Sequence, residues 1–454
     1  MKLHLSALLV IALAISSKGE ISPAQTNGLD KAQLAYNLKT TVEAYNSVGS
    51  KSEQWNEEAT NCLKTFATIR AVTNGSSTEL INQLTAGLTR LDARKCKDPL
   101  IRYLYAKFVY SQSHSSPENA LAFEHVAADL GKSSYPAIRK FWADYWAASY
   151  YLSGTNQAKG MSFLNEASSS LKSALDDNSM AMIEADQACD RIMTLNFWPD
   201  PGRWNAYSIF EPTLTNRWHA TSWALLAKGR AYLTYGWIAR GRGYANTVTD
   251  QGWELMKSRL DVAAESLEAA WKLNPNDLRI CVEMMRVELG QGKGRDRLEL
   301  WFQRGMKLDP ANYDVCYQKL EYLRPRWYGS IDDMIQFGRE CTLNTNYAGS
   351  VRLLLADAHA EASREIQDES RRKAYWQQTN VWSDIQSAFS QFFKLYPDAV
   401  GYRHNYARYA AWCGQWQEFE NQVKLFPSTN YNYFGGVERF NQMIKTAEQQ
   451  AKKN

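Results

Sequence analysis

The sequence predicts an all-α protein, an α-superhelix in which helical hairpins stack one on the next. Three observations support this fold class. Apolar residues recur at steps of three and four, capping residues with proline or glycine separate these segments, and one short segment recurs about 35 residues later. A repeat of this kind is typical of units that cannot bury their apolar face alone and therefore stack on their neighbours.

Helical periodicity is clearest within residues 252–273. Apolar side chains recur there at helical steps, including Leu260, Ala263, Leu267 and Ala270, with charged residues between them. This spacing places the apolar side chains on one face of a helix. Alternation with a period of two, which would indicate a strand, is not sustained anywhere, so we expect no β-sheet.

Helix starts are predicted from pairs of a capping residue and a proline. Three such pairs are Asp98–Pro99, Asn274–Pro275 and Asp309–Pro310. Aspartate and asparagine side chains accept hydrogen bonds from free N–H groups at a helix start, and proline suits the first helical position because its missing N–H is not needed there. We therefore expect a helix to begin at each pair.

The repeated segment includes two of these pairs. Residues 271–276 read WKLNPN, residues 306–311 read MKLDPA, and residues 393–398 give a third copy, FKLYPD. The period of about 35 residues and the terminal proline are those of tetratricopeptide repeats. The match is best over residues 251–345, which predicts a tetratricopeptide-like (TPR-like) solenoid there.

The N-terminal residues 1–19 have the pattern of a signal peptide. Lys2 supplies the positive charge, residues 8–14 lie at the centre of a short apolar stretch, and small residues such as Ser16 and Ser17 follow. No other stretch is apolar for the roughly 18 residues that a membrane-spanning helix needs. The sequence thus predicts an exported protein, periplasmic or secreted, without a membrane span.

Composition suggests how the remaining chain is divided and which classes of partner it binds. We expect an N-terminal helical region over residues 20–195, an irregular connection rich in proline and aromatic residues over 196–217, and a C-terminal TPR-like region over 218–454. Apolar residues make up 45% of the chain, enough for a large packed interior. The formal net charge of +4 is too small to favour a nucleic-acid partner.

The cysteines and histidines do not indicate a metal or a cofactor. Seven cysteines are present without C-x-x-C spacing, and the six histidines show no metal-ligand spacing. Cys281 and Cys316 occupy equivalent positions of successive repeats, and equivalent helices pack about 8–10 Å apart. This is too far for a disulfide, so we expect this pair to be unbridged.

Aromatic residues are dense between residues 197 and 256. Such side chains line peptide and sugar grooves, but they also fill the space between helices. Most of them follow helical spacing, which packing explains. Trp204 and Tyr207 fall in the expected irregular connection, where a ligand contact and a packing role are equally compatible with the sequence.

The segment RGRGYAN provides the other candidate ligand contacts, Arg240, Arg242, Tyr244 and Asn246. Glycines permit close backbone approach, and arginine side chains suit carboxylate or phosphate groups. The same arginines could instead join helix ends within the fold. If a ligand site exists, we expect it at these four residues together with the loop that carries Trp204 and Tyr207.

Several segments together resemble a known family. Residues 237–245 (WIARGRGYA), 252–253 (GW), 289–292 (LGQG) and 323–330 (LRPRWYGS) are similar to a family of exported bacterial proteins of the planctomycete and verrucomicrobial type, described as a domain of unknown function with TPR-like helices. The resemblance covers about residues 218–345. It implies a bacterial origin and an α-superhelix, and it implies no particular activity, ligand or catalytic residue.

Two functional hypotheses follow. The first is a binding or scaffolding protein that engages a protein or peptide partner outside the cytoplasm, because stacked helical repeats commonly receive such partners. The alternative is a glycan-acting enzyme with an aromatic carboxylate cleft in a helical toroid, for which Glu211, Asp250 and Glu254 are candidate acids. No catalytic motif is present, which favours the first hypothesis, and the sequence makes no prediction about oligomeric state.

Overall fold

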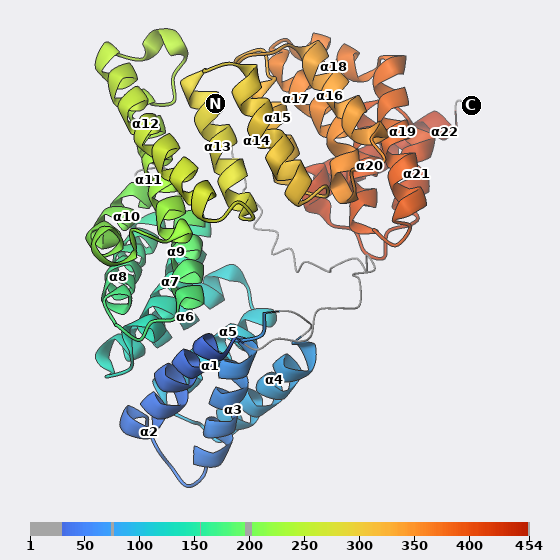
Figure 1. The fold of residues 1–454 in the computed structure, drawn as a ribbon. Helices are drawn as coiled ribbons and strands as arrows, with labels where there is room; N and C mark the ends of the chain where they lie inside the picture. Colours follow the sequence, from blue (N-terminus) through green and yellow to red (C-terminus); the bar gives the residue numbers. More distant parts are fainter. Residues whose placement is uncertain (1–29, 74–76, 155, 196–201, 453–454) are drawn as a thin grey trace. The chain divides into compact units, whose positions relative to one another are not determined.

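The computed structural model describes residues 30–73, 77–154, 156–195 and 202–452 (Figure 1). Every secondary-structure element among these residues is a helix, which confirms the all-α class. The expected signal peptide lies outside the described residues. In the part that is described, no helix is sufficiently long and apolar to cross a membrane.

The chain divides into two compact units, residues 1–273 and residues 274–454. The sequence instead predicted an irregular connection at 196–217 as the divide, and this prediction was wrong. Residues 196–201 lie outside the description, but residues 202–218 form helices whose apolar side chains belong to the hydrophobic core of the first unit. Burial of this segment makes it part of a unit and not a linker.

The first unit consists of helices of very different lengths. Its elements are α1 (Lys31–Leu38), η1 (Lys39–Glu43), α2 (Ala44–Val48), α3 (Asn56–Ile69), α4 (Thr78–Ala93), α5 (Pro99–Phe108), η2 (Tyr110–Gln112), α6 (Ser116–Lys132), α7 (Ala137–Ser153), α8 (Gln157–Leu175), α9 (Met182–Thr194), α10 (Gly202–Thr213), η3 (Leu214–Trp218), α11 (Ser222–Arg240), η4 (Ala245–Thr247) and α12 (Asp250–Leu273).

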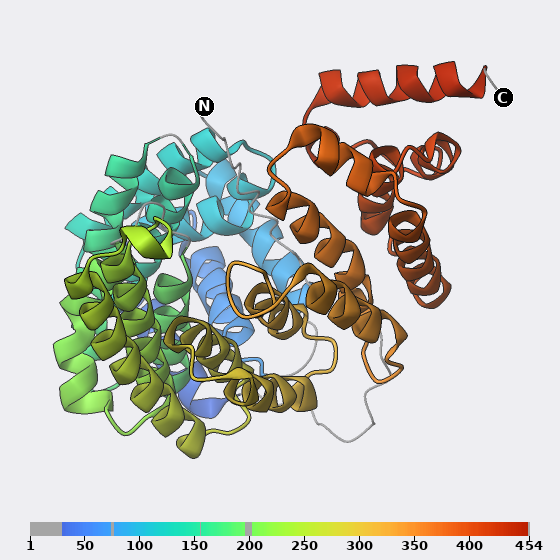
Figure 2. The same cartoon turned by 90° about the horizontal axis from the view of Figure 1, so that it is seen from above.

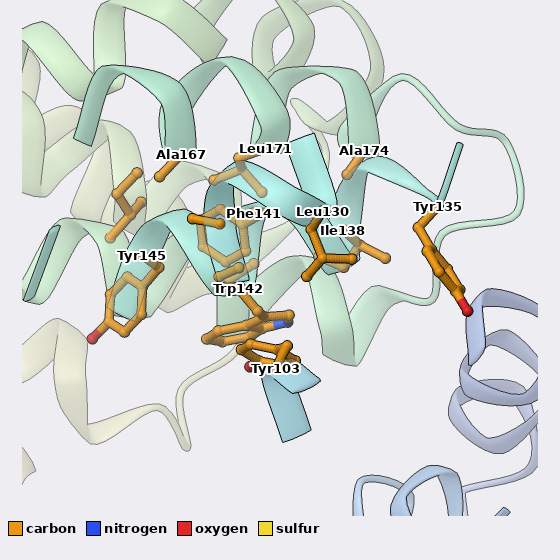
Figure 3. Close-up of a cluster of buried hydrophobic side chains, with 14 of the residues drawn as sticks. Tyr103, Leu130, Tyr135, Ile138, Phe141, Trp142, Tyr145, Ala167, Leu171 and Ala174 are labelled. Carbon is orange, nitrogen blue, oxygen red and sulfur yellow. The ribbon is translucent and has the colours of Figure 1, made fainter. Parts of the chain in front are cut away.

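Aromatic side chains of α7 form the centre of this unit. Phe141 lies next to Leu171 of α8, Tyr145 packs on Phe141, and the neighbouring Trp142 packs edge to face on Phe141 (Figure 3). Large buried rings such as these contribute most of the apolar area that a core removes from water. Helix α7 is therefore held between α6 and α8.

A buried ionic network joins α1 to this core. Glu184 of α9 accepts hydrogen bonds from Gln33 Nε2 at 2.7 Å, Arg70 Nη2 at 2.9 Å and Trp142 Nε1 at 2.7 Å. Burial opposes ionisation, but the charges of Arg70 and Arg139 lower the pKa of Glu184 to about 2. The charge is fully compensated, so the network fixes α1 against α7 and α9.

The second unit begins at Asn274, directly after α12, and continues to the C-terminus. Its elements are α13 (Leu278–Gln291), α14 (Arg295–Leu308), α15 (Tyr313–Tyr322), α16 (Ile331–Leu343), η5 (Gly349–Leu353), α17 (Leu354–Glu365), α18 (Glu369–Trp376), α19 (Thr379–Leu395), α20 (Gly401–Trp412), α21 (Trp416–Val423), η6 (Tyr431–Phe434) and α22 (Val437–Ala451).

Helices of the second unit pack in an alternating order. Helix α13 contacts α14 and α15, α15 contacts α17, and α17 contacts α16 and α19. Figure 2 shows these helices from above, coloured yellow to orange. Helices α13, α15, α17 and α19 thus form a row in which each contacts the next.

The repeated segment ends a helix at the same point each time. Helices α12, α14 and α19 end at Leu273, Leu308 and Leu395, the third residue of each copy. The expected helix start at Asn274–Pro275 and at Asp309–Pro310 was nevertheless wrong, because each proline lies in the turn ahead of the next helix.

The true N-terminal caps lie three residues beyond the first residue of each expected pair. Asp277 accepts a hydrogen bond from the N–H of Arg279, and Asn312 accepts one from the N–H of Val315. Asp98 behaves as predicted, since its carboxylate caps α5 and a proline follows it.

Candidate functional site

The predicted arginine and glycine segment forms the loop between α11 and α12. Helix α11 ends at Arg240, and Gly241 follows with φ +73°, a conformation that L-residues with side chains rarely adopt. The N–H of Gly241 donates to the carbonyl oxygens of Trp237 and Ile238, which closes the last turn of the helix. This glycine therefore has a structural role as a helix terminator.

Arg240 is held within this loop. Its Nη1 donates to the carbonyl oxygen of Gly243 at 3.0 Å, and its guanidinium lies 5.8 Å from the ring centre of Trp237 and 5.5 Å from that of Trp253. Hydrogen bonds and cation–π contacts of this kind stabilise the loop conformation. The side chain thus joins the two ends of the hairpin.

The other three predicted residues of the loop face solvent. Tyr244 is 84% exposed, and Arg242 and Asn246 are also exposed. The structure therefore places Arg242, Tyr244 and Asn246 where a partner could reach them, although sequence adjacency alone brings them together.

Trp204 and Tyr207 do not lie in a loop, so this part of the prediction was wrong. Both belong to α10, and Tyr207 is buried. The ring of Trp204 stacks on Tyr235 of α11 with a centroid distance of 3.9 Å and packs edge to face on Tyr232. A three-residue step continues through Tyr207 to Phe210, which was the available signal for a helix.

A different site, which sequence reasoning missed, lies within the second unit. A cavity of about 250 Å³, partly open to solvent, is lined by residues of α15, η5, α17, α19 and α20. Its walls include a carboxyl group, an amide and several aromatic rings: Tyr313, Asp357, Phe389, Tyr402, Asn405 and Tyr409. A small, largely aromatic cavity with a few converging polar groups has the usual chemistry of a ligand site.

Asp357 is the acidic group of this cavity, and two tyrosines hold it in place. Tyr313 of α15 donates to its Oδ2 at 2.9 Å, and Tyr409 of α20 donates to its Oδ1 at 3.2 Å. The residue lies deep in the unit but retains partial solvent exposure, and it lines the cavity. The carboxyl group therefore faces the cavity in a fixed orientation.

Burial raises the pKa of Asp357 above its usual value, although the two tyrosine hydroxyl groups and the charge of Arg408 act in the opposite direction. The pKa values of Tyr313 and Tyr409 are raised by burial and by the charge of Asp357, so both hydroxyl groups stay protonated as donors. The carboxyl group is thus harder to ionise than a free aspartate side chain, and a further positive charge in the cavity would favour its ionised form.

One wall of the cavity is a short 3-10 helix, η5, that a buried arginine fixes. Arg352 donates from Nε to the carbonyl oxygen of Tyr347 at 3.0 Å and from Nη1 to that of Thr342 at 3.3 Å. The N–H of Gly349 donates to the hydroxyl of Tyr396 at 2.9 Å. These bonds position Ser350 on the cavity wall.

Further along α17, the carboxylates of Glu361 and Glu365 are neutralised by arginine side chains. Tyr317 donates to Glu361 Oε1 at 3.1 Å, and Arg324 lies 3.0 Å from Glu361 Oε2 and 2.8 Å from Glu365 Oε1. Arg364 also forms an ion pair with Glu361. Glu361 and Glu365 are therefore committed to the interface between helices.

A second polar cluster of this unit contains His359 of α17. One ring nitrogen lies 2.7 Å from the hydroxyl of Tyr375, and the other lies 3.1 Å from Asp384 Oδ2, which also accepts hydrogen bonds from Arg339. Burial and the charge of Asp384 raise the pKa of Tyr375, so its hydroxyl is a poor nucleophile. The cluster joins α16, α17, α18 and α19 and has a structural role.

The candidate acids of the enzyme hypothesis do not form a pair in a cleft. Asp250 and Glu254 are exposed in the first turns of α12, and Glu211 of α10 interacts with Tyr207 and Tyr232. Across the described ranges, no group of three or more histidine, cysteine, aspartate or glutamate side chains could hold a metal ion. No protein-family model matches the chain, and no curated protein matches it.

Proposed function

We propose that this chain is an exported binding protein whose second unit, residues 274–454, is a TPR-like superhelix that takes a segment of a partner polypeptide. The observation that carries the proposal is the cavity beside Asp357, which lies among α15, η5, α17, α19 and α20. In helical-repeat proteins, a row of like helices commonly forms the surface that receives a peptide.

The helix ends support the superhelical part of this proposal. Copies of the repeated segment end α12 and α14 with a spacing of 35 residues, and α13 and α15 begin with the same spacing, at Leu278 and Tyr313. An equal spacing of helix ends and helix starts along the sequence is what a repeating unit requires.

Export is proposed from the N-terminal sequence and from the resemblance to the exported bacterial family. The test is N-terminal sequencing of the protein recovered outside the cytoplasm of a bacterial host. We expect the mature chain to begin near Glu20, because small residues precede this position. Recovery of the chain from the cytoplasm with Met1 in place would contradict export.

A glycan-acting enzyme is the less favoured function. Glycoside hydrolysis generally needs two carboxyl groups that face each other across the substrate. The cavity presents Asp357 as its acidic side chain, and Glu361, one helical turn away, is engaged by Arg324 and Arg364. This arrangement suits recognition of a ligand better than acid–base catalysis.

The loop between α11 and α12 is proposed as a separate contact surface of the first unit. Arg242, Tyr244 and Asn246 are exposed there on a loop that Arg240 stabilises. Exposed aromatic and arginine side chains frequently contribute to protein interfaces.

The proposal is tested by selecting a displayed random peptide library against the intact chain. We expect an enriched peptide whose affinity falls at least tenfold in the variant Ser350→Trp, because the indole fills the cavity from η5. The matched control is Ser387→Trp on the exposed face of α19, which should keep full affinity. Absence of any enriched peptide, or equal binding by both variants, would refute the proposal.

A further inference from the structure

The cavity beside Asp357 combines a carboxyl group with aromatic and aliphatic walls. We propose that it binds a primary ammonium group on an unbranched alkyl chain, with Asp357 as the counter-ion, and that the natural group is a lysine side chain of the partner. This inference rests on the proposed function, since that function places a polypeptide at this cavity.

The size of the cavity fits such a group. Its volume is about 250 Å³, whereas one water molecule needs roughly 10–15 Å³ measured in this way. The cavity therefore has room for an extended four-carbon chain and its ammonium group.

The walls match the two parts of a lysine side chain. Leu353 and Ala356 supply aliphatic surface, and Phe389, Tyr402 and Tyr409 supply aromatic surface. Aliphatic surface packs against the methylene groups, while an aromatic face attracts the cation by its quadrupole. An acidic or a neutral polar ligand would use only part of this surface.

The hydrogen-bonding groups favour an ammonium over a guanidinium. Each oxygen of Asp357 already accepts one tyrosine hydroxyl, which leaves one further acceptor position on each oxygen. Ser350 and Asn405, whose side chains carry oxygen acceptors, also line the cavity. An ammonium group has three donors that point in different directions and suit acceptors on Asp357, Ser350 and Asn405 together, whereas the donors of a guanidinium all lie in one plane.

The charges around Asp357 predict how binding depends on pH. The groups that face it are Tyr313 from α15, Tyr409 and Arg408 from α20, and Glu361 from the next turn of α17, while α19 contributes the uncharged Phe389. A bound cation favours the ionised carboxyl, so the protonated site must release its proton on binding. Affinity therefore rises with pH until the carboxyl group is ionised in the free protein.

Isothermal titration calorimetry of the intact chain with small probes tests this inference. The probes are Nα-acetyl-L-lysine methylamide, its norleucine analogue, which lacks the ammonium group, and n-pentylamine. We expect the lysine probe to bind at least tenfold more tightly than the norleucine probe, with an affinity that falls once the pH is low enough to protonate Asp357 in the free protein. Equal affinity of these two probes would overturn the inference.

Variants identify the counter-ion. Asp357→Asn keeps the shape of the side chain and should lower affinity for the lysine probe at least tenfold while leaving norleucine binding unchanged. The matched control is Asp314→Asn, in the exposed first turn of α15, which should bind like the wild type. Full affinity in a folded Asp357→Asn variant would overturn the inference, and if that variant does not fold, the comparison of probes on the wild type decides.

The outcomes separate this inference from the proposed function. An enriched peptide without lysine at its contact position supports the function and refutes the ammonium site. Pentylamine that binds as tightly as the lysine probe, without any enriched peptide, supports the ammonium site, assigns it to a free alkylamine and refutes the polypeptide ligand.

Discussion

Replacing Asp144 by asparagine should stabilise the first unit at pH 8 much more than at pH 5. Asp144 of α7 is buried, and Ser170 of α8 donates a hydrogen bond to its Oδ2 at 3.1 Å. Burial raises the pKa of Asp144 from 3.8 to about 7; Glu166 adds to this effect, and Ser170 and Lys140 oppose it. The native state therefore holds the proton over a range in which the unfolded chain has lost it.

The sign and size of the effect follow from this difference in pKa. The stability contributed by the protonated carboxyl group is complete below about pH 4 and is lost as the pH rises through about 7. One pKa unit corresponds to about 1.4 kcal/mol, so the total is roughly 4 kcal/mol, of which roughly 3 kcal/mol is lost between pH 5 and pH 8. Asparagine is neutral throughout and keeps an acceptor for Ser170.

The assay is hydrogen exchange of peptides from α7 and α8 in increasing urea, which reports the unfolding of this unit alone. The stabilisation by Asp144→Asn should grow by roughly 3 kcal/mol from pH 5 to pH 8. The control, Asp129→Asn on the exposed face of α6, should show no such growth. If the two variants respond to pH equally, Asp144 does not titrate near neutral pH and our view of its surroundings is incorrect.

Three further predictions concern packing, the loop and the thiols. Leu267→Ala should lower stability by roughly 2–5 kcal/mol in urea unfolding, because Leu267 is fully buried; a change below 1 kcal/mol would argue against its packing. Arg240→Ala should lower the melting temperature, because it removes the hydrogen bond to Gly243. Tyr244→Ala, at an 84% exposed residue, should leave the melting temperature unchanged and weaken partner binding. Calorimetry checks both variants, and equal melting temperatures would contradict the role of Arg240 in the loop. A hydrogen bond with Cys316 and burial raise the pKa of the Cys341 thiol, so iodoacetamide at pH 8 should modify it only in urea, as mass spectrometry can verify; modification of the native chain would refute its burial.

Much of the fold could be predicted because its signals are local. The helical periodicity near Leu267 and the cap at Asp98 depend on residues within one or two turns, and both agree with the structure. The prediction of a loop around Trp204 was wrong because it relied on the nearby prolines and not on the helical spacing of the aromatic residues. Pro212 lies in the last turn of α10 and is tolerated there, while the steps from Trp204 to Tyr207 to Phe210 follow the helix.

The cavity could not be predicted because its residues meet only through packing. Tyr313 and Tyr409 reach Asp357 from positions 44 and 52 residues away in the sequence. No spacing rule for a single helix brings them together. The sequence instead predicted a site at the glycine-rich segment 240–246. The positive φ of Gly241 and the contacts of Arg240 explain the unusual sequence of this segment.

The packing of α15 against α17 explains why Asp357 in particular faces the cavity. Once Tyr313 lies opposite Asp357, the common helical pitch places Tyr317 opposite Glu361, one turn further along both helices. Glu361 then meets Arg324, and its charge is compensated within the interface. At the other end of the row, Asp357 has only hydroxyl groups as hydrogen-bonding partners among the described residues, and the cavity adjoins it. The same register that neutralises one carboxylate thus leaves the other able to accept a cation from outside.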